Sequence, residues 1–532
     1  MSNPLPKRQM GAPLSCLLAG ILAALSLPPF HLVPVLALAF PLFLIRLAQA
    51  DSKKQAFVLG WAFGFGYFVA GLYWIGHALA VDIGRFWWLM PFAVAGLPCV
   101  LAVYIGLIAV IWHVLTGGAD KQKGVAACLV WAVLWMLAES LRGAAFTGFP
   151  WNIVAVSWLG FLPVAQSVAV IGGLGLGMLT VALASLPAAM LGRGWDRRLA
   201  MPSMALGVML FMGLAAWGQS RLDQGAGLAD TTTKLRLVQP GFHPIVAEAT
   251  ESSRAQRNTR FQSLLKLTAS LPREVLDPNG PWVIWPETAV PFFMDQDLQL
   301  RLEIASVTPP GRAVLTGVPT EKHTMQEGGR IFYNSLYAVD SNGAILARYH
   351  KSHLVPFGEY VPGRAVLSRF IPIEAIATGA TDFSPGPGPV TMRLPGLPPF
   401  SPLICYESIF DGGLVDPADR PEWLLNITND SWYGYSTGPW QHLSLARLRA
   451  MEQGLPLVRV ATNGVSVVTD PMGQIRHQLP WRSAATADVP LPQTLSAVPL
   501  YARYHPWPPY ILGLGVLVLA WFMRRKTDVT KK

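Results

Sequence analysis

The stretch Trp282-Val-Ile-Trp285-Pro-Glu287 predicts a short buried strand that is stopped by a proline and followed directly by a carboxylate. Its first four residues are aromatic or β-branched, as is typical of buried strands, and a proline cannot continue the hydrogen-bond ladder. Glu287 therefore stands where packed scaffold gives way to a cleft. This pattern predicts a sheet that carries an ionisable group at its edge.

Short apolar runs recur through residues 230–500, separated by turns and by two or three helical stretches. Asp340-Ser-Asn-Gly343 is a strong hairpin signal between two of these runs. We expect strands at 234–239, 282–285, 313–317, 332–339, 344–349, 402–405, 423–427 and 458–469, and helices at 247–271 and 439–453. Mixed strands and helices of this kind indicate an α/β domain whose sheet faces are both covered.

Two more polar residues stand directly after predicted strands, because Lys351 follows residues 344–350 and Cys405 follows residues 402–404. A thiol is a weak nucleophile until a base or a positive environment favours the thiolate. A carboxylate such as Glu287 can take its proton, and a lysine can stabilise a developing oxyanion. Each residue also has a structural interpretation: the cysteine can fill the core, the glutamate can cap a helix, and the lysine can be solvated. The residues alone leave both interpretations open.

The rest of the chain is more apolar than this domain. Of the 532 residues, 52% are hydrophobic and 14% are charged, whereas a typical soluble domain is about 25% charged. Four cysteines exclude a disulfide-built scaffold. The net charge of +10 does not indicate nucleic acid, because many basic residues lie in short runs beside apolar segments. We expect an integral membrane protein with one sizeable soluble domain and no nucleic-acid partner.

The apolar segments predict a polytopic α-helical membrane domain, since a spanning helix needs about 20 mainly apolar residues. Candidate spans lie at 12–28, 32–48, 55–80, 87–115, 124–142, 161–192, 200–219 and 509–523. The sixth is long enough to tilt or break. We therefore expect about seven helices in residues 1–220, an extracytoplasmic α/β domain in 230–500, and an eighth helix with a basic tail in 509–532.

Basic residues predict the orientation of these spans. With a cytoplasmic N-terminus and one crossing per span, fifteen Lys and Arg residues lie inside, while Arg85 and Arg142 lie outside. The inner set is Lys7, Arg8, Arg46, Lys53, Lys54, Lys121, Lys123, Arg193, Arg197, Arg198, Arg524, Arg525, Lys526, Lys531 and Lys532. This positive-inside bias predicts that both termini are cytoplasmic and that residues 220–508 lie outside the cytoplasm.

The segment between the fifth and sixth spans is unusual. Glu139 and Arg142 lie three residues apart at the outer end of a predicted helix, and Phe146-Thr-Gly-Phe-Pro-Trp151 follows. An ionisable residue at membrane depth is a functional hypothesis. We favour the simpler interpretation of an ion pair with interfacial aromatic anchoring. Trp151 is a better candidate for contacting what the outer domain processes.

Several motifs resemble the Glu–Lys–Cys motifs of the nitrilase superfamily. They are Trp285-Pro-Glu287, Tyr349-His-Lys351 with Pro356-Phe-Gly-Glu359, and Cys405-Tyr-Glu407. Asn429-Asp-Ser-Trp-Tyr-Gly434, Gly438-Pro-Trp-Gln-His442 and Ala446-Arg-Leu-Arg-Ala450 resemble the distal motifs of one membrane-embedded branch, the apolipoprotein N-acyltransferases. The resemblance covers nearly the whole chain, including Glu139-Ser-Leu-Arg142 and Thr147–Trp151. It implies a nitrilase-like α-β-β-α sandwich placed between seven helices and an eighth.

This resemblance implies a ping-pong acyltransferase of the bacterial inner membrane, with its catalytic domain on the periplasmic side. Its acyl donor would be a phospholipid, typically phosphatidylethanolamine, and its acceptor the α-amine of diacylglyceryl-cysteine at a lipoprotein N-terminus. Cys405 would form a thioester, Glu287 would be the general base, and Lys351 would hold the oxyanion beside a backbone N–H near Tyr406. Glu359 matches a supporting carboxylate, and Tyr406, Glu407 and Trp432 match other positions important in the family. We expect a monomer.

Residues 354–372 carry apolar side chains among prolines and glycines, namely Phe357, Tyr360, Val361, Leu367, Phe370 and Ile371. We predict a lid that dips into the membrane interface and gates lipid entry. The alternative is a loop packed on its own domain. No metal or other cofactor is implied, because the chain lacks an H-E-x-x-H pattern and His350-x-x-His353 lacks the partners of a zinc site.

Three other functions stay open. A membrane-anchored nitrilase-type hydrolase would discharge the same thioester to water, although one helix would suffice as its anchor. A Cys-His enzyme would use His350 or His353 as the base. A transporter or receptor would need intramembrane ionisable groups, and the predicted spans lack a charged row.

Overall fold

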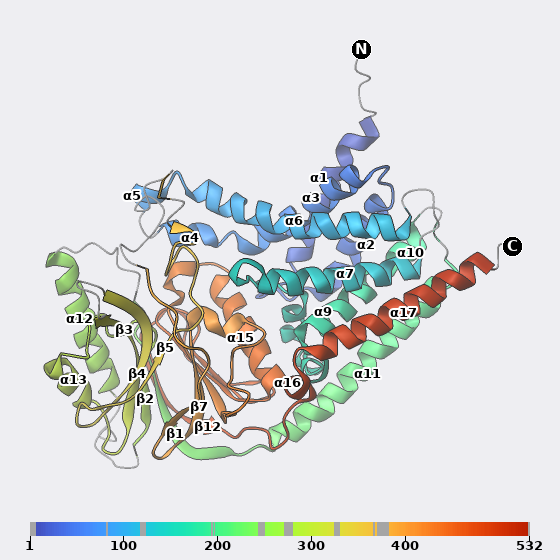
Figure 1. Ribbon diagram of the computed structural model, residues 1–532. Helices are drawn as coiled ribbons and strands as arrows, with labels where there is room; N and C mark the ends of the chain where they lie inside the picture. Colours follow the sequence, from blue (N-terminus) through green and yellow to red (C-terminus); the bar gives the residue numbers. More distant parts are fainter. Residues whose placement is uncertain are drawn as a thin grey trace.

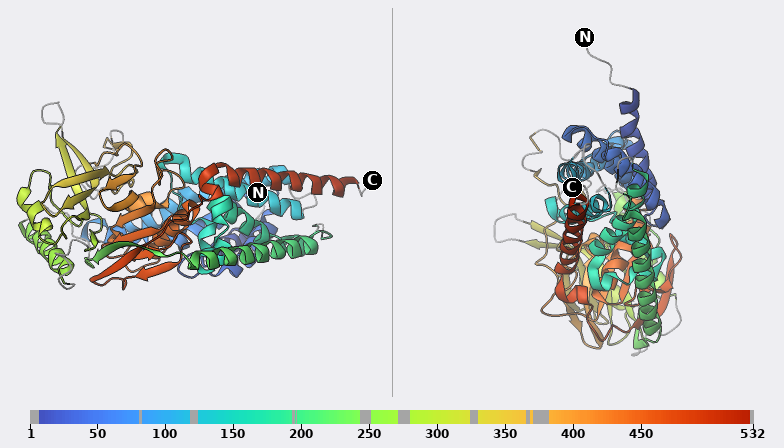
Figure 2. Two further views of the ribbon diagram at one scale, coloured as in Figure 1. Left: turned by 90° about the horizontal axis from the view of Figure 1, so that it is seen from below. Right: turned by 90° about the vertical axis from the view of Figure 1, so that its right-hand side faces the viewer.

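The computed structural model describes residues 7–80, 83–117, 124–192, 195, 197–242, 251–270, 280–323, 330–364, 368–369 and 382–529. Its long helices group on one side of the molecule and its strands on the other (Figure 1). A view from below shows an elongated shape, with the sheets at one end and the C-terminal helix reaching the other (Figure 2). A helical domain and a strand-rich domain are therefore joined in one molecule, as the sequence predicts.

Apolar helices form the first domain. Within the described residues, six helices are long and apolar enough to cross a membrane, and two shorter apolar helices precede them. The eight helices are α1 (Lys7–Ala24), α2 (Leu36–Leu47), α3 (Lys53–Leu72), α6 (Met90–Thr116), α7 (Val125–Ala144), α9 (Val168–Ser185), α11 (Ala200–Ala226) and α17 (Trp507–Val529). Each predicted span overlaps one of them. The polytopic helical domain is confirmed, and the number of actual crossings stays a prediction.

Short helices connect the long ones. They are η1 (Val33–Val35), α4 (Ile75–Ala80), α5 (Ile83–Phe86), η2 (Ala145–Thr147), η3 (Val154–Gly160), α8 (Leu162–Ala165) and α10 (Pro187–Leu191). The predicted sixth span is broken into several of these pieces, and α9 itself is interrupted at Gly172, where φ is 67° and ψ is 170°. A positive φ suits glycine. The break leaves the backbone N–H of Gly173 free to donate to Glu452 Oε1 of the strand-rich domain, at 2.6 Å.

Two six-stranded sheets form the second domain. The first has the order β12-β1-β2-β3-β4-β5, with β1 (Asp230–Gln239), β2 (Trp282–Ile284), β3 (Ala313–His323), β4 (Arg330–Asp340), β5 (Ile345–His350) and β12 (Ala485–Pro492). The second has the order β11-β10-β9-β8-β7-β6, with β6 (Met392–Leu394), β7 (Leu397–Ile404), β8 (Trp423–Thr428), β9 (Leu457–Ala461), β10 (Val467–Thr469) and β11 (Ile475–Gln478). The central strands β1, β2 and β3 are parallel, as are β7, β8 and β9.

Helices cover the outer faces of both sheets. Helices α12 (Glu251–Thr268) and α13 (Leu298–Ala305) lie beside the first sheet, and α15 (Gly438–Gln453) lies between the second sheet and the membrane helices (Figure 1). Apolar side chains from both sheets, such as Ile284, Leu315 and Ile404, fill the space between them. The predicted α-β-β-α sandwich is confirmed. Helix α15 also packs against α9, so it belongs to the boundary between the two domains.

The predicted strand at 458–469 is wrong in one respect, because the chain reverses within it. Strands β9 and β10 pair antiparallel, with Val467 opposite Arg459. The intervening Asn463-Gly464 is a favoured turn sequence. Strand β12 was not predicted, because its alternating prolines resemble a loop, and prolines are tolerated at a sheet edge such as this. Most of the predicted helix 247–271 is α12, and residues 247–250 and 271 lie outside the described residues.

Candidate active site

Cys405 lies on a strained turn at the end of β7. Its φ is +54°, a left-handed conformation that non-glycine residues rarely adopt outside sites where the surroundings enforce it. Strand β7 ends at Ile404, and the 3-10 helix η6 (Cys405–Ile409) starts at once. The hydroxyl of Ser408 donates to the Cys405 carbonyl at 3.0 Å, which closes the turn. The thiol is therefore held at the end of a central strand, almost wholly buried.

Glu287 follows β2 at the facing sheet, as predicted. Its Oε1 accepts from Asn334 Nδ2 at 2.7 Å, and its Oε2 accepts from the backbone N–H of Asn429 at 2.7 Å. Gly317 permits this placement, because a Cβ there would lie 2.5 Å from the Glu287 backbone. One carboxylate oxygen is thus bonded to β4 of the first sheet, and the other to the residue that follows β8 of the second sheet, which also carries Cys405.

Lys351 follows β5 and joins two carboxylates. Its Nζ lies 2.9 Å from the carboxylate of Glu359 and 3.8 Å from Glu287 Oε1. Glu359 is fixed in turn, because its Oε2 accepts from the backbone N–H of Val355 at 2.7 Å. The ammonium is almost completely buried. The structure therefore brings the predicted Glu287, Lys351 and Glu359 together in one buried cluster.

Burial and mutual charge change the acidity of these groups. Burial raises the pKa of the Cys405 thiol, and the nearby Glu287 carboxylate raises it further, while the opposing effect of Lys351 is smaller. Burial also raises the pKa of Glu287, against the influence of Lys351. Burial alone would lower the pKa of Lys351, but Glu359 and Glu287 raise it well above its usual value. These shifts favour the neutral thiol and the charged lysine, so a base is needed to form the thiolate.

Glu407 ties the Cys405 turn to the segment that follows Lys351. Its Oε2 accepts from the backbone N–H of Ile404 at 2.7 Å. Its Oε1 accepts from four donors of the other segment, which are Tyr349 OH (2.7 Å), Ser352 N (2.7 Å), Ser352 Oγ (2.8 Å) and His353 N (3.2 Å). These five hydrogen bonds are all with the scaffold, and they fix the thiol-bearing turn relative to the lysine.

Two predicted residues lie where the membrane and catalytic domains meet. The hydroxyl of Tyr406, next to the nucleophile, donates to the carbonyl of Gly148 at 3.1 Å. The indole of Trp151 donates to Gln441 Oε1 of α15 at 2.8 Å, and the indole of Trp74 reaches the same oxygen at 3.0 Å. Trp151 is fully buried among aromatic rings. Its contact with a substrate stays a prediction, as does the role of Trp432, which is half-buried in η7 (Asp430–Tyr433).

Comparison of the chain with known proteins shows which family it matches. A model of the apolipoprotein N-acyltransferase N-terminal domain matches residues 19–186, and one of carbon-nitrogen hydrolase matches residues 252–498. The apolipoprotein N-acyltransferase of Rhodopseudomonas palustris is 39% identical over 526 residues, covering 96% of this chain and 94% of that protein. The chain belongs to the apolipoprotein N-acyltransferase family. The corresponding protein of Bradyrhizobium diazoefficiens is 37% identical, covering 94% of this chain and 93% of that protein.

Solved structures similar to the chain cover about half of it. A carbon-nitrogen hydrolase from Helicobacter pylori G27 is 12% identical, with a TM-score of 0.34, and covers 49% of this chain and 88% of that one. An amidase from Nesterenkonia sp. is 18% identical, with a TM-score of 0.35, and covers 52% of this chain and 95% of that one. The family membership predicted from the motifs is confirmed, and this membrane protein is an acyltransferase of the nitrilase superfamily.

In this N-acyltransferase, Glu139 and Arg142 do not form the ion pair that their spacing predicts. Glu139 Oε1 accepts from the backbone N–H of Val154 at 2.9 Å. Arg142 donates to the carbonyls of Phe149 and Trp151, at 2.7 and 2.5 Å. Both side chains are buried. The two residues instead form hydrogen bonds with the backbone of the loop 148–154. This loop carries the Gly148 carbonyl and Trp151, which contact the catalytic domain.

A buried polar network beneath Cys405 was not predicted. His442 of α15 lies with Nε2 3.2 Å from the Cys405 carbonyl oxygen and Nδ1 2.9 Å from Asp430 Oδ1. Arg459 of β9 pairs with Asp430 at 2.7 Å. Burial alone would raise the pKa of Asp430, but Arg459 and His442 hold it well below its usual range. The sequence does carry one sign of this network, because Arg459 is a charged residue within the otherwise apolar strand β9 (Leu457–Ala461).

Asn334 was also missed. It lies in the middle of β4, where asparagine is disfavoured, and it is buried. That mismatch was the signal in the sequence. Its partners could not be inferred, because they come from the segments that follow β2 and β5.

The predicted lid lies partly outside the described residues, which exclude Leu367, Phe370 and Ile371. Of the rest, Phe357 is about half exposed with φ +63°, Tyr360 is half-buried, and Val361 is buried. Arg364 pairs with Asp382 at 2.6 Å. The exposed Phe357 beside Glu359 fits an apolar lid, and gating stays a prediction.

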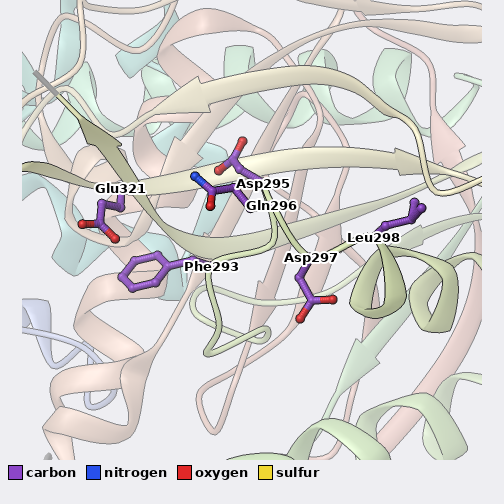
Figure 3. Close-up of a pocket in the computed structure, with 6 residues that line it drawn as sticks. All are labelled: Phe293, Asp295, Gln296, Asp297, Leu298 and Glu321. Carbon is purple, nitrogen blue, oxygen red and sulfur yellow. The ribbon is translucent and has the colours of Figure 1, made fainter.

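A cavity of about 370 Å³ lies elsewhere on the catalytic domain. It is lined by Phe293, Asp295, Gln296, Asp297, Leu298 and Glu321 (Figure 3). Its carboxylates have internal partners: Asp295 pairs with Arg348, Glu321 pairs with Arg330, and Asp297 caps α13. None of these residues belongs to the Cys405 cluster. Among the residues that the structure describes, no group of three or more His, Cys, Asp or Glu side chains is arranged to hold a metal ion.

Proposed function

We propose that the protein transfers an acyl chain from a membrane phospholipid, of the phosphatidylethanolamine type, to the N-terminal α-amine of a diacylglyceryl-cysteine lipoprotein. The relatives named apolipoprotein N-acyltransferase support the lipoprotein acceptor. Cys405 carries the acyl group between the two substrates as a thioester. The observation that carries this proposal is the placement of a buried thiol on a strained turn, beside Glu287 and Lys351. The next residue, Tyr406, donates a hydrogen bond to Gly148 of the membrane domain.

The first half-reaction forms the thioester. Glu287 takes the proton of the Cys405 thiol, and the thiolate attacks the ester carbonyl carbon of the phospholipid. The ammonium of Lys351 and the backbone N–H near Tyr406 stabilise the oxyanion that develops on the carbonyl oxygen. The tetrahedral intermediate collapses, the ester C–O bond breaks, and the lysophospholipid alkoxide leaves with the proton held by Glu287. The raised pKa of the thiol makes this base necessary, because the unassisted thiol stays protonated.

The second half-reaction discharges the thioester. The α-amine of the acceptor attacks the thioester carbonyl, and Glu287 takes a proton from the attacking nitrogen. The C–S bond breaks, an amide forms, and the Cys405 thiolate regains its proton from Glu287. The same base and oxyanion groups serve both halves, so the two substrates need not be bound together, and ping-pong kinetics follow.

The environment of the histidines argues against a Cys-His mechanism. The Nδ1 atom of His350 lies 2.7 Å from Ser335 Oγ, and its ring stacks on Tyr333. The ring of His353 packs 3.8 Å from that of Phe410. Among the described residues, neither ring is hydrogen-bonded to the Cys405 thiol, whereas the Glu287 carboxylate is close enough to raise the pKa of that thiol. Glu287→Gln is therefore expected to abolish acylation, and retention of activity would restore the histidine alternative.

The membrane helices favour a lipid donor over a soluble amide. Moving an acyl chain from the bilayer into water costs about 0.8 kcal/mol per CH₂ group, so the thiol must meet the lipid at the membrane surface. We place the catalytic domain on the periplasmic side of the bacterial inner membrane, with both termini cytoplasmic and the enzyme a monomer. The positive-inside bias of the loops supports this orientation.

Intact-mass spectrometry tests the proposal. Purified protein is incubated with phosphatidylethanolamine and no amine acceptor, beside Cys405→Ser. We expect an acyl-sized mass increment on the wild type that hydroxylamine removes and that the variant lacks. A diacylated lipopeptide should then discharge the adduct and gain the chain, whereas discharge to water alone at the same rate would indicate a hydrolase. No adduct on folded protein would count against a lipid donor.

A further inference from the structure

We propose that Asn334 is a positioning residue that holds Glu287 and Glu359 side by side as carboxylates around the Lys351 ammonium. The inference rests on the proposed function, in which Glu287 must be ionised to take the thiol proton. Asn334 belongs to none of the motifs that suggested the catalytic residues. It reaches them from the middle of β4, where its side chain is buried.

One nitrogen atom of Asn334 serves both carboxylates. Its Nδ2 donates to Glu287 Oε1 at 2.7 Å and to Glu359 Oε1 at 2.8 Å. An amide nitrogen carries two hydrogens, so each carboxylate receives one. The backbone carbonyl of Asn334 also accepts from the backbone N–H of Lys351 at 2.8 Å. A single residue therefore contacts all three members of the buried charge cluster.

The arrangement has an electrostatic problem that Asn334 relieves. Two buried carboxylates face one ammonium, and neighbouring like charges favour protonation of one of them. Lys351 is within hydrogen-bonding distance of Glu359 but lies 3.8 Å from Glu287. Glu287 thus depends on two other donors for its ionised form, which are Asn334 Nδ2 and the backbone N–H of Asn429. Asn334 is the side-chain donor of the two, and a hydrogen bond to the charged form favours that form.

A neutral donor suits this position better than a cation. It favours ionised Glu287 without adding a second positive charge, which would pair with the carboxylate and weaken it as a base for the thiol proton. It also favours both carboxylates in their ionised form, because one oxygen of each accepts from the same nitrogen. The base therefore stays available while Lys351 remains free to face the oxyanion.

The test measures acyl-enzyme formation against pH in Asn334→Asp and Asn334→Leu, with phosphatidylethanolamine as donor and intact mass as readout. Asparagine and aspartate have nearly the same shape, so Asn334→Asp preserves packing while it replaces the donor with a third acidic group, whose charge moves the limb in the same direction. Asn334→Leu removes the donor without adding a charge. Losing a hydrogen bond to a charged group weakens the ionised form about 10- to 100-fold, so the acid limb of the profile should move up by about one to two pH units. The rate should recover toward the wild-type value above the shifted limb. Ser335→Ala, at the next buried position of β4, should keep the wild-type limb.

Two outcomes would overturn the proposal. One is a wild-type pH profile in Asn334→Asp. The other is an equal loss of rate at every pH with an unmoved limb, which is what a purely structural role predicts. If Asn334→Leu does not fold, the isosteric Asn334→Asp still decides between these results. Failure of the proposed function looks different, because the wild type itself would then form no adduct on Cys405 or would keep its rate in Glu287→Gln.

Discussion

Replacing Glu407 with glutamine tests whether this carboxylate acts by fixing the Cys405 turn to the Lys351 segment. The carboxylate accepts five hydrogen bonds, four at Oε1 and one, from Ile404, at Oε2. A glutamine side chain has one acceptor oxygen and one donor nitrogen. If the oxygen keeps the four-donor position, the NH₂ group must face the N–H of Ile404, and two donors oppose each other at the start of the catalytic turn.

The cost follows from that geometry. A hydrogen bond to a charged group contributes about 1.5–3 kcal/mol, and the four retained bonds weaken because their acceptor becomes neutral. We therefore expect a loss of about 2–4 kcal/mol, which lowers the midpoint of thermal unfolding in detergent by roughly 5–15 °C for a domain of this size. The turn that carries Cys405 loses its fixed position, and a displacement of about 1 Å can slow acylation roughly 10²-fold.

The assay compares acyl-enzyme formation by intact mass with thermal unfolding, well below the midpoint of the variant. Glu422→Gln is the matched control, because Glu422 is exposed on the same domain and should change neither quantity. Wild-type acylation and an unchanged midpoint in Glu407→Gln would refute the anchoring role. Lost acylation with an unchanged midpoint would also refute it, and would indicate that Glu407 takes part in the chemistry directly.

Three further changes have expected outcomes. Because burial raises the pKa of Glu287, wild-type acylation should fall with decreasing pH through a limb that lies above the ordinary glutamate value of about 4.3, as a pH–rate profile would measure. Arg142→Met removes two hydrogen bonds to the loop 148–154 and should slow acylation at least about tenfold in the mass assay, whereas Arg46→Met at the other end of the membrane domain should not. Asp430→Asn breaks a buried pair with Arg459 and should lower stability by about 3–5 kcal/mol in denaturant unfolding. Because the pKa of Asp430 is depressed, the ionised carboxylate adds its full share to the wild-type free energy of unfolding above about pH 4, and this share is lost as pH falls. The difference in unfolding free energy between wild type and variant should therefore shrink in acid.

Most strands and most members of the candidate site were predictable because their signals are local. Glu287, Lys351 and Cys405 each follow a short apolar run directly, and a strand end can be recognised within a few residues. The hairpin at 340–343 and helix α15 were predictable for the same reason. The reversal inside 458–469 was missed because continuous apolar character outweighed the Asn463-Gly464 turn signal.

The contacts between elements were not predictable, because the order of the strands in a sheet depends on pairing between distant segments and no local pattern determines it. Asn334 meets Glu287 only because β2 and β4 flank β3, and His442 meets Cys405 only because α15 covers β7 and β8. The prediction of an ion pair between Glu139 and Arg142 was wrong for the same reason, because their partners come from another segment. Helical spacing brings the two side chains to one face, but the loop 148–154 offers each a backbone partner that a local pattern cannot reveal.

Three hydrogen bonds explain why one anchoring helix would not be enough. Gly148 accepts from Tyr406 beside the nucleophile, Trp151 donates to Gln441, and the broken helix α9 donates from Gly173 to Glu452. Gln441 and Glu452 belong to the same helix, α15, whose His442 contacts the Cys405 carbonyl. The membrane domain thus sets the position of the thiol directly through Tyr406 and indirectly through α15. Under the proposed function, the thiol must meet a phospholipid ester at a fixed depth in the bilayer, and this placement serves that need. A tethered domain would sample many heights and would have to draw each CH₂ group into water at about 0.8 kcal/mol.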